Sequence, residues 1–537
     1  MDIIITGAGL SGLSTALSLR RANPLHRITI LERSSHYNHS TSTNTTTITT
    51  TTTTKPQHHS SHEIGAAINV PPNISRFLCH PSPGRGWGLD PVKQKFVKSE
   101  GVLVMNPMTM EQIGEGLDHS RNEEVYGEGG ALWYAHRVDL HGGLLGLVLG
   151  TTEGDESEVE IGDGKEIGDD DGAGNGDGKE GKRERKGWVR IEGGKEVIAY
   201  DPSTPSVTLS NNTVLAADLI IAADGVHSRA PESVLGHPNH EPQMLPDPKL
   251  NTCYRFLIPT AEIANDPETM FFLDSDNKEA NVCRLWPDVL GKKRLICYRC
   301  RGGEILNFVV MLRDETTNTD TTKREDWHAP ISKSEVLSKL SDFHPGILAV
   351  INKATDVKRW PLLYRPPIPT WHKDRLVLVG DAAHPMLPHH GQGGAQAIED
   401  GLALGLVLSD LSSSSPCSSS SFPSSLFAAK IEHRLNLYEK IRRNRASAIQ
   451  VMSNVGFDEQ SEAEAPKELE EYLREEEREE GSQKQKRKGV VPKTMKEVVE
   501  FEYGPDVVER TVRVMREAQV VGGKEGWKVP EGFFPGF

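Results

Sequence analysis

Residues 2–22 read DIIITGAGLSGLSTALSLRRA, and this stretch decides the fold of the 537-residue chain. Its apolar start, residues 2–6, predicts a short buried strand. Residues 10–22 carry leucines at helical spacing, and residues 27–31 (RITIL) predict a second strand. The order strand, helix, strand indicates a parallel α/β sheet, with the glycine pattern Gly7-Ala8-Gly9-Leu10-Ser11-Gly12 at its first turn.

Each glycine of this pattern has its own physical reason. Gly7 permits the tight turn, Gly9 lets the backbone approach a pyrophosphate, and Gly12 lets helix and strand pack closely. Glu32 ends the second predicted strand, where a carboxylate accepts hydrogen bonds from ribose hydroxyls. The combination predicts a bound dinucleotide rather than a glycine-rich turn without a ligand, and both FAD and NAD fit it.

A second loop of this kind lies in residues 375–401, RLVLVGDAAHPMLPHHGQGGAQAIEDG. A predicted strand ends at Gly380-Asp381, and a helix starts near Gly393. Asp381 can accept a hydrogen bond from a polyol hydroxyl. Gly391, Gly393 and Gly394 leave backbone N–H groups bare at a helix N-terminus, which suits a flavin edge or a pyrophosphate.

A third turn, Asp224-Gly225, follows the apolar stretch 214–222, which we predict to be one strand. Further along, residues 251–312 alternate as short apolar and polar runs and predict a β-rich region.

These motifs, in this order, resemble those of the class A FAD-dependent aromatic monooxygenases of fungal type, which are salicylate hydroxylase-like and share the para-hydroxybenzoate hydroxylase fold. Two lesser signatures agree, GAAINVPPN at 65–73 and HRVDL at 136–140. The resemblance covers residues 2–33, 63–145 and about 187–455. It implies an α/β fold with a Rossmann-like FAD-binding domain of the GR2 type, an inserted β-rich substrate domain and C-terminal helices.

The domain borders expected from this resemblance are as follows. The FAD-binding domain is discontinuous and takes residues 1–33, 63–149, 188–245 and 371–455, the substrate domain takes 246–370, and a helical or extended tail takes 456–537. Residues 34–62, 150–187 and 409–425 are rich in Thr, in Gly with acidic residues, and in Ser. Such compositions bury too little apolar surface to order a chain, so we expect disordered insertions.

The resemblance also implies which residues contact the cofactor. The expected FAD-binding residues are Gly7, Gly9, Leu10, Ser11, Gly12, Glu32, Arg33, Ala66, Ala67, Arg137, Asp224, Gly225, Asp381, Gly391, Gly393 and Gly394. The first loop would hold the adenosine diphosphate half, and Asp381 the ribityl chain. The Asp224-Gly225 turn is associated in this family with both FAD and NAD(P)H.

The implied activity is hydroxylation of a phenol or aromatic acid by O2, with NADH or NADPH as co-substrate and a flavin C4a-hydroperoxide as intermediate. Two residues of the β-rich region, Arg255 and Tyr298, are the candidates for contacting the substrate phenolate or carboxylate. The plainer alternative is a structural ion pair for Arg255 and packing within the sheet for Tyr298. His384 is expected to make a structural hydrogen bond, and His389 and His390 to lie in the loop that faces the flavin.

Two other functions remain open at this point. One is an epoxidase or oxidoreductase of the same fold that acts on a non-aromatic or polyketide substrate. The other is a flavin-binding protein without turnover, which the run Ser228-Arg229-Ala230-Pro231 after the Asp-Gly turn favours, since the family usually has another Arg there.

Composition excludes several other classes. The net charge of −15 and the lack of an obviously basic face disfavour nucleic acid as a partner, and no apolar run reaches the roughly 18 residues that span a bilayer. Of the six cysteines only Cys297 and Cys300 have CxxC spacing, and no second pair completes a metal site. We therefore expect no metal and a cytoplasmic location. The oligomeric state stays open.

Overall fold

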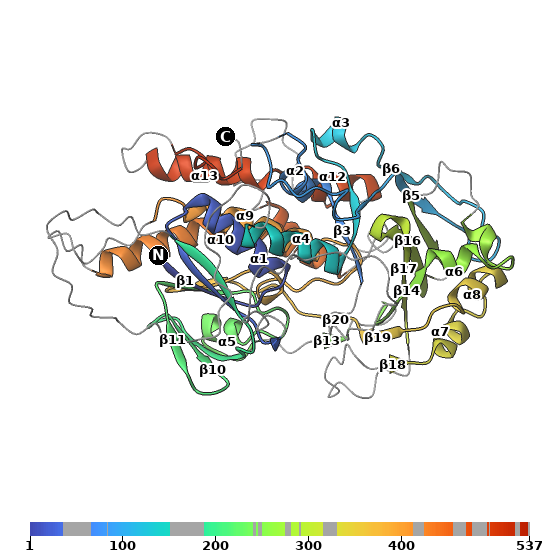
Figure 1. Ribbon diagram of the computed structural model, residues 1–537, viewed down its shortest axis with the longest axis horizontal. Coiled ribbons are helices and arrows are strands. Elements are labelled where there is room, and N and C mark those ends of the chain that lie inside the picture. The colour runs from blue at the N-terminus through green and yellow to red at the C-terminus, as the bar shows by residue number, and fades with distance from the viewer. Residues whose placement is uncertain are drawn as a thin grey trace, which may run out of the picture.

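The computed structural model describes most of the chain (Figure 1). The described residues are 1–35, 66–82, 84–150, 187–239, 243–244, 250–273, 281–288, 291–314, 330–411, 424–454, 469–474, 491–492, 494–520 and 527–534. The insertions that we predicted at 34–62, 150–187 and 409–425 lie outside these ranges except for a few residues at their ends.

A six-stranded sheet forms the centre of one half of the molecule, in the order β21-β22-β12-β1-β2-β8. Its strands are β1 (Asp2–Thr6), β2 (Arg27–Leu31), β8 (Trp188–Glu192), β12 (Leu219–Ala222), β21 (His372–Lys373) and β22 (Leu376–Leu378). All neighbours pair in parallel except β21 and β22. The loops that follow β1, β2, β12 and β22 therefore leave the same edge of the sheet.

The helices beside this sheet are α1 (Leu10–Ala22), α4 (Arg137–Leu149), α9 (Gly393–Val407), α10 (Ser424–Ser453) and α13 (Val507–Val520). Figure 1 shows α1, α9 and α10 side by side, with α13 along them, and the same helices are in contact. Gly405 of α9 lies so close to α1 that a Cβ there would come within 2.1 Å of Ser18 Oγ. A small residue at this point lets the two helix backbones approach.

The predicted strand at 214–222 is wrong, because the structure divides it between two sheets. β11 (Val214–Ala216) pairs antiparallel with β10 (Ser206–Leu209), which also pairs with β9 (Val197–Asp201). β12 begins at Leu219 in the parallel sheet. Between the two strands, Asp218 N–H donates to the Asp2 carbonyl and Ala217 N–H to that of Pro205, and these bonds redirect the chain.

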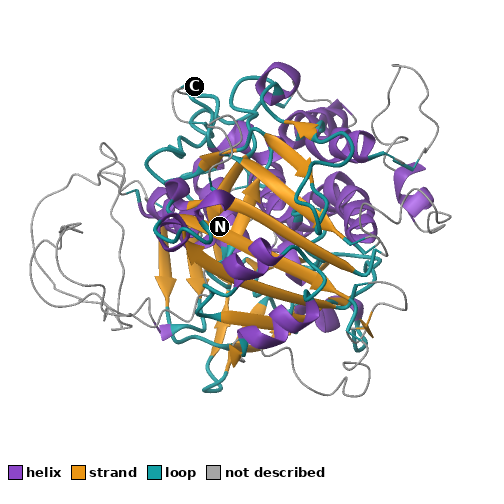
Figure 2. Ribbon diagram, turned by 90° about the vertical axis from the view of Figure 1, so that its right-hand side faces the viewer, coloured by secondary structure: helices purple, strands orange, loops and turns teal. Residues whose placement is uncertain are grey.

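The other half of the molecule contains an eight-stranded sheet in the order β18-β19-β14-β17-β16-β15-β5-β6. Its strands are β5 (Gly101–Val104), β6 (Leu117–Asp118), β14 (Thr252–Pro259), β15 (Val282–Pro287), β16 (Lys293–Cys300), β17 (Ile305–Leu312), β18 (Pro330–Ile331) and β19 (Val357–Pro361). Figure 2 views the molecule from the side of this sheet and shows its strands crossing the molecule. β5 and β6 come from the range 63–149, which the sequence assigned to the FAD-binding domain, but they pair in this sheet. The domain borders drawn from the sequence stay a prediction.

One face of this sheet is covered by α6 (Thr260–Ala264), α7 (Lys333–Lys339) and α8 (Pro345–Ile351), which pack on Phe256, Phe308 and Trp286. The opposite face is turned toward the six-stranded sheet and its helices. A small sheet of β3 (Ala67–Val70), β7 (Trp133–His136) and β4 (Val97–Lys98) lies between the two halves. Helix α2 (Pro72–Leu78) follows β3 in the chain.

The C-terminal region adds α12 (Met495–Tyr503) before α13, and a capping box of Thr494 and Glu497 starts it. The remaining short elements are α3 (Asn122–Tyr126), α5 (Ala230–Leu235), β13 (Gln243–Met244), β20 (Leu363–Tyr364), η2 (Met270–Phe272), η4 (Arg301–Gly303) and η6 (Gly380–Ala382). Among the described helices, none is both long and apolar enough to cross a membrane.

Candidate active site

The first glycine loop lies directly against the Asp224-Gly225 turn. Gly7 has a φ of 93°, and a Cβ on it would come within 2.5 Å of the Ala223 carbonyl oxygen. A Cβ on Gly12 would lie 2.0 Å from the carbonyl oxygen of Gly7. At Gly9, by contrast, a Cβ would meet no described atom within 4 Å. The loop is therefore packed on the sides of Gly7 and Gly12 and open at Gly9.

Helix α1 presents its N-terminus at this open side. Gly9 is the N-cap residue and supplies no side-chain cap, and the N–H of Leu13 is the first to bond back to the Gly9 carbonyl, at 2.9 Å. Uncapped N–H groups and the helix dipole together favour an anion such as a phosphate. The predicted residues Leu10 and Ser11 stand in this first turn.

Glu32 closes the same edge of the sheet. Its Oε2 accepts a hydrogen bond of 2.8 Å from the N–H of Ala8, and its Oε1 accepts one of 2.8 Å from Ser34. The carboxylate is thus held beside the glycine loop. Arg33, next along the chain, has an exposed side chain.

The loop after β22 meets the first loop through Gly380. Gly380 has a φ of 60°, and a Cβ on it would lie 2.7 Å from Ser11 Oγ and 3.2 Å from Ala397 Cβ. Asp381 therefore stands next to the first turn of α1. The glycine loop at 7–12, the Asp224-Gly225 turn and the loop after β22 all meet at one edge of the parallel sheet. More than 150 residues separate each of them from the next along the chain.

Asp381 has an unusual environment. Its side chain is accessible to solvent, yet burial by surrounding protein raises its pKa, against the opposing charges of His384, Arg137 and Arg365. The carboxylate is thus exposed and is still surrounded by enough protein to disfavour its charged form. Arg365 is a member of this site that sequence reasoning missed, because it stands in a Pro-rich stretch without a recognisable motif.

Strand β3 connects this region with the eight-stranded sheet. A Cβ on Gly394 would lie 2.6 Å from Ile68 Cδ1, and one on Gly391 would lie 2.6 Å from Asn69 Nδ2. On the other side, the N–H of Ala67 donates to Oδ1 of Asn307 in β17 at 3.3 Å. The N-terminus of α9 and the open face of the large sheet therefore lie on either side of one short strand.

The remaining predicted residues of this region are close by. The N–H of Arg137 donates to the carbonyl of Ala66 at 2.9 Å, and the Arg137 side chain is exposed. Gly393 is the first residue of α9, whose N-cap residue Gln392 makes no side-chain cap. As at α1, the helix presents uncapped N–H groups.

Arg255 and Tyr298 lie on the same face of the large sheet, the face turned toward β3. Arg255 stands opposite Val309 in the register, and Tyr298 stands opposite Asn307, two residues away on the same strand. Burial raises the pKa of Tyr298, and the charge of Arg255 acts in the opposite direction. The structure thus brings the two predicted substrate residues within electrostatic reach of each other.

The surroundings of Arg255 and Tyr298 bear on the structural roles that were the alternative to substrate binding. The Arg255 guanidinium lies 5.0 Å from the ring centroid of Trp360, and it forms no ion pair with any residue that the structure describes. Tyr298 does pack, and its ring stacks on Tyr134 with a centroid distance of 4.4 Å. Both rings are buried.

Arg255, Asn307 and Tyr298 form a polar strip on this face of the sheet, and two apolar clusters adjoin it. One cluster contains Leu387 from the loop after Asp381, with Met311 and Leu362. The other contains Tyr298 and Tyr134 with Tyr503 from α12. Apolar packing next to these polar groups lowers the local polarity, which suits chemistry that water would disturb.

Asp224 is anchored rather than free. Tyr200 in β9 donates to its Oδ2 at 2.6 Å, and Thr6 Oγ1 lies 2.8 Å from the same Tyr200 hydroxyl. Burial raises the pKa of Asp224. Gly225 follows with a φ of 81°. Sequence reasoning missed Tyr200, which lies in a strand outside the motifs.

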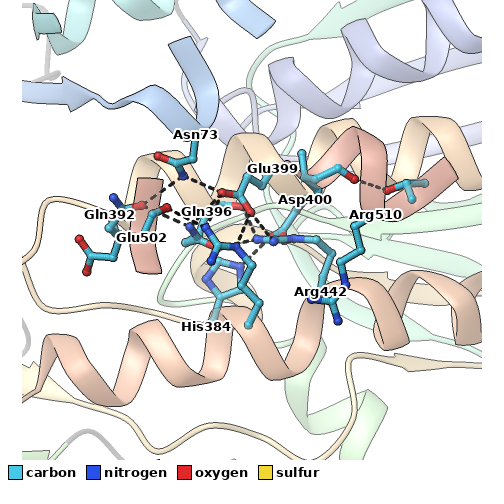
Figure 3. Close-up of polar contacts among 12 residues, drawn as sticks. Asn73, His384, Gln392, Gln396, Glu399, Asp400, Arg442, Glu502 and Arg510 are labelled. Atoms are coloured by element: carbon cyan, nitrogen blue, oxygen red, sulfur yellow. Dashed lines mark hydrogen bonds and ion pairs between the residues drawn. The ribbon is translucent and has the colours of Figure 1, made fainter. Parts of the chain in front are cut away.

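A buried polar network supports the loop of Asp381 (Figure 3). Asp400 in α9 accepts from the N–H of Gly380 at 2.8 Å and contacts His384 Nε2 at 2.6 Å. Its other oxygen accepts from Arg442 Nε at 2.8 Å. His384 therefore has the structural hydrogen bond that we expected, and its partner Asp400 ties the loop to α9 and α10.

Glu399, next to Asp400, extends the network to α2. Its oxygens contact Arg442 Nη1 at 2.5 Å and Arg445 Nε at 3.1 Å, and one accepts from Asn73 Nδ2 at 2.6 Å. Burial acts to raise the pKa of Glu399, but the two guanidinium groups outweigh it and lower the pKa to about 2. The loop that carries Asp381 is thus supported by charged residues that the sequence motifs did not reveal.

Comparison with known proteins agrees with this geometry. Residues 180–414 match the family model described as FAD binding domain, and residues 2–139 match the one described as FAD dependent oxidoreductase. The structure of a salicylate hydroxylase substrate complex is 17% identical with a TM-score of 0.59, covering 96% of this chain and 97% of that one, which shows the α/β fold predicted from the sequence.

Relatives extend over nearly the whole chain. Hispidin-3-hydroxylase of Neonothopanus nambi is 27% identical over 460 residues, 84% of this chain and 86% of its own. The FAD-dependent monooxygenase cfoG of Aspergillus candidus is 36% identical over 475 residues, 88% of this chain and 89% of its own. Identity of this extent across both halves of the molecule shows that the chain belongs to the FAD-dependent monooxygenases, flavoenzymes with FAD as cofactor.

Proposed function

We propose that this enzyme hydroxylates a phenol or an aromatic acid, with NADH or NADPH as electron donor and O2 as oxygen source. The observation that carries the proposal is the position of Arg255 and Tyr298. They stand on the sheet face that meets β3, and β3 meets the N-terminus of α9. A ring bound there would lie next to the expected position of the flavin.

The residues present fit an extended flavin dinucleotide. The open side at Gly9 and the uncapped N-terminus of α1 suit the pyrophosphate, and the exposed Asp381 carboxylate beside α1 can accept from the ribityl hydroxyls. We propose that FAD is held by Gly7, Gly9, Leu10, Ser11, Gly12, Glu32, Arg33, Ala66, Ala67, Arg137, Asp224, Gly225, Asp381, Gly391, Gly393 and Gly394. FAD supplies the two-electron chemistry and the activation of O2.

The chain itself has three tasks in this mechanism. Arg255 favours the phenolate or carboxylate form of the substrate through its charge, and a phenolate ring is the better nucleophile. Tyr298 can donate a hydrogen bond to the same oxygen and fixes the ring orientation. The clusters around Leu387 and Tyr503 keep water away from the reacting ring.

The names of several relatives support an aromatic substrate. One is 3-hydroxybenzoate 6-hydroxylase 1 of Aquipseudomonas alcaligenes, 26% identical over 411 residues, with 76% of this chain and 80% of its own covered. For location we propose the cytoplasm, since the described cysteines are all free thiols, as expected in a reducing compartment.

The proposal is tested with FAD-reconstituted enzyme. Oxidation of NADH and of NADPH is followed with and without each member of a panel of hydroxybenzoates and resorcinols, and hydroxylated product and H2O2 are quantified. We expect at least one phenol to accelerate NAD(P)H oxidation and to yield product. Flavin reduction that no phenol or aromatic acid accelerates would contradict the aromatic substrate and favour the non-aromatic alternative.

A further inference from the structure

A third polar residue, Asn307, stands between Arg255 and Tyr298. It lies near the middle of β17, with 1% of its surface exposed, directly opposite Tyr298 and two residues from the partner of Arg255. Its neighbour Phe308 points to the opposite face, into the core beneath α6, α7 and α8. Asn307 therefore shares the face on which we place the substrate.

The orientation of the Asn307 amide is fixed by β3. Only an oxygen can accept from an N–H, so the bond from Ala67 N–H identifies the atom facing β3 as Oδ1. The Nδ2 group then points elsewhere, and it is buried without a hydrogen-bond partner among the described residues. Burying a donor without a partner is unfavourable, and a ligand oxygen would supply the partner that Nδ2 lacks among the described residues.

The three strands around this amide carry donors and no acidic residue. Arg255 Nε is also buried without a hydrogen-bond partner in the described part of the chain. The three adjacent strands, TCYRFLIP, KRLICYRC and ILNFVVML, contain no Asp or Glu. Two buried donors on one face of the sheet, one of them on an arginine, are complementary to an anionic oxygen of a ligand.

We propose that Asn307 Nδ2 donates a hydrogen bond to the phenolate or carboxylate oxygen of the aromatic substrate and so determines specificity for it. This inference rests on the proposed function and adds a residue that the family motifs do not contain. Asn307 also holds Ala67 through Oδ1, so one amide would connect the substrate with the strand that lies beside the N-terminus of α9.

Two variants separate this role from a merely structural one. Asn307→Asp keeps an oxygen for the Ala67 N–H but replaces the donor with an acceptor. Asn307→Leu removes both groups at similar volume. Phe308→Leu, on the same strand and the opposite face, is the matched control, since it perturbs the sheet core without touching the polar strip. Flavin content and circular dichroism verify that each variant is folded.

The readout is ligand binding to the holoenzyme by ¹⁹F NMR, with 3-fluorophenol and 3-fluorobenzoate as probes and 3-fluorotoluene as the matched ring without an acidic oxygen. We expect both Asn307 variants to bind the preferred oxygen-bearing probe about 10- to 100-fold more weakly, as for the loss of a hydrogen bond to a charged group, with 3-fluorotoluene unaffected. Phe308→Leu should preserve the preference.

The outcomes distinguish the two levels of the argument. Wild-type enzyme that prefers neither fluorophenol nor fluorobenzoate over fluorotoluene contradicts the proposed function and the Asn307 assignment with it. A wild-type preference that survives intact in Asn307→Asp overturns the Asn307 assignment alone.

Discussion

Nδ1 of His390 lies 2.5 Å from Oε1 of Glu502, and both side chains are buried. The contact joins the loop before α9 to helix α12 in the C-terminal region, 112 residues later in the chain. Arg445 in α10 donates to the Glu502 carbonyl at 2.8 Å and fixes the end of α12 in turn. Helix α12 is therefore part of the support of the loop that carries Gly391, Gly393 and Gly394.

Replacing Glu502 by Leu should loosen this loop. The change leaves His390 without its acidic partner in a buried place, a loss of about 1–3 kcal/mol in the free energy of unfolding. A looser loop admits water, so we expect more H2O2 and less hydroxylated product per NAD(P)H oxidised. Urea denaturation and product stoichiometry measure the two effects. Glu500→Leu, an exposed position on the same helix, is the control, and equal uncoupling in both variants would contradict the role of Glu502.

Two glycines of the first loop should respond in opposite ways to alanine. Gly12→Ala places a methyl group 2.0 Å from the Gly7 carbonyl oxygen, so the protein should fold poorly or not at all. Gly9→Ala meets no described atom within 4 Å and needs no left-handed backbone, so the apoprotein should keep its Tm. If the pyrophosphate lies at Gly9, the same methyl group should still weaken FAD binding by tenfold or more. Thermal denaturation of apoprotein and FAD titration test the pair, and normal FAD affinity in Gly9→Ala would contradict this placement.

Sequence reasoning succeeded where local patterns carry the information. Helix α1 spans Leu10–Ala22, the range predicted from its leucine spacing, and Gly7 adopts a positive φ in the tight turn expected there. The meeting of the three loops could also be expected, because parallel strands deliver their following loops to one edge of a sheet.

The residues that sequence reasoning missed depend on contacts between residues far apart in the sequence. Ala67 and Asn307 are 240 residues apart, and Tyr200 is 194 residues from Thr6, whose hydroxyl it contacts. A side chain that meets a distant partner leaves no periodicity and no motif. The prediction of one strand over 214–222 was wrong for the same reason. Hydrogen bonds from Ala217 to Pro205 and from Asp218 to Asp2 end one strand and begin the next within an apolar run.

Removing the charge of Arg255 should shift the pH profile of hydroxylation. A cation beside the substrate oxygen lowers the pKa of a bound phenol, so in Arg255→Gln that pKa rises and the active phenolate form appears only at higher pH. We expect the rising limb of kcat to move to higher pH by about one unit, with a lower kcat at neutral pH. The control is Arg284→Gln, because Arg284 lies 5.6 Å from the Phe272 ring on the opposite face of the sheet. An unchanged profile in Arg255→Gln would place the substrate oxygen elsewhere.

The stability of the protein should depend on the charge of Glu399. Its pKa falls from an ordinary value of 4.5 to about 2 in the folded protein, because the charges of Arg445 and Arg442 outweigh the effect of burial. A carboxyl group with a lowered pKa stabilises the folded state above pH 4.5, and this contribution is lost as the pH falls toward 2. Its size is on the order of 3 kcal/mol.

Glu399→Gln should therefore be less stable than the wild type at pH 7, with a difference that shrinks steadily between pH 4.5 and pH 2. Over that interval the wild-type carboxyl takes up a proton and comes to resemble the neutral amide. Urea denaturation at a series of pH values measures the difference, and Glu432→Gln, exposed on α10, controls for general loss of charge. A difference that stays constant down to pH 2 would mean that Glu399 stabilises the loop of Asp381 by hydrogen bonding and packing, and not by its charge.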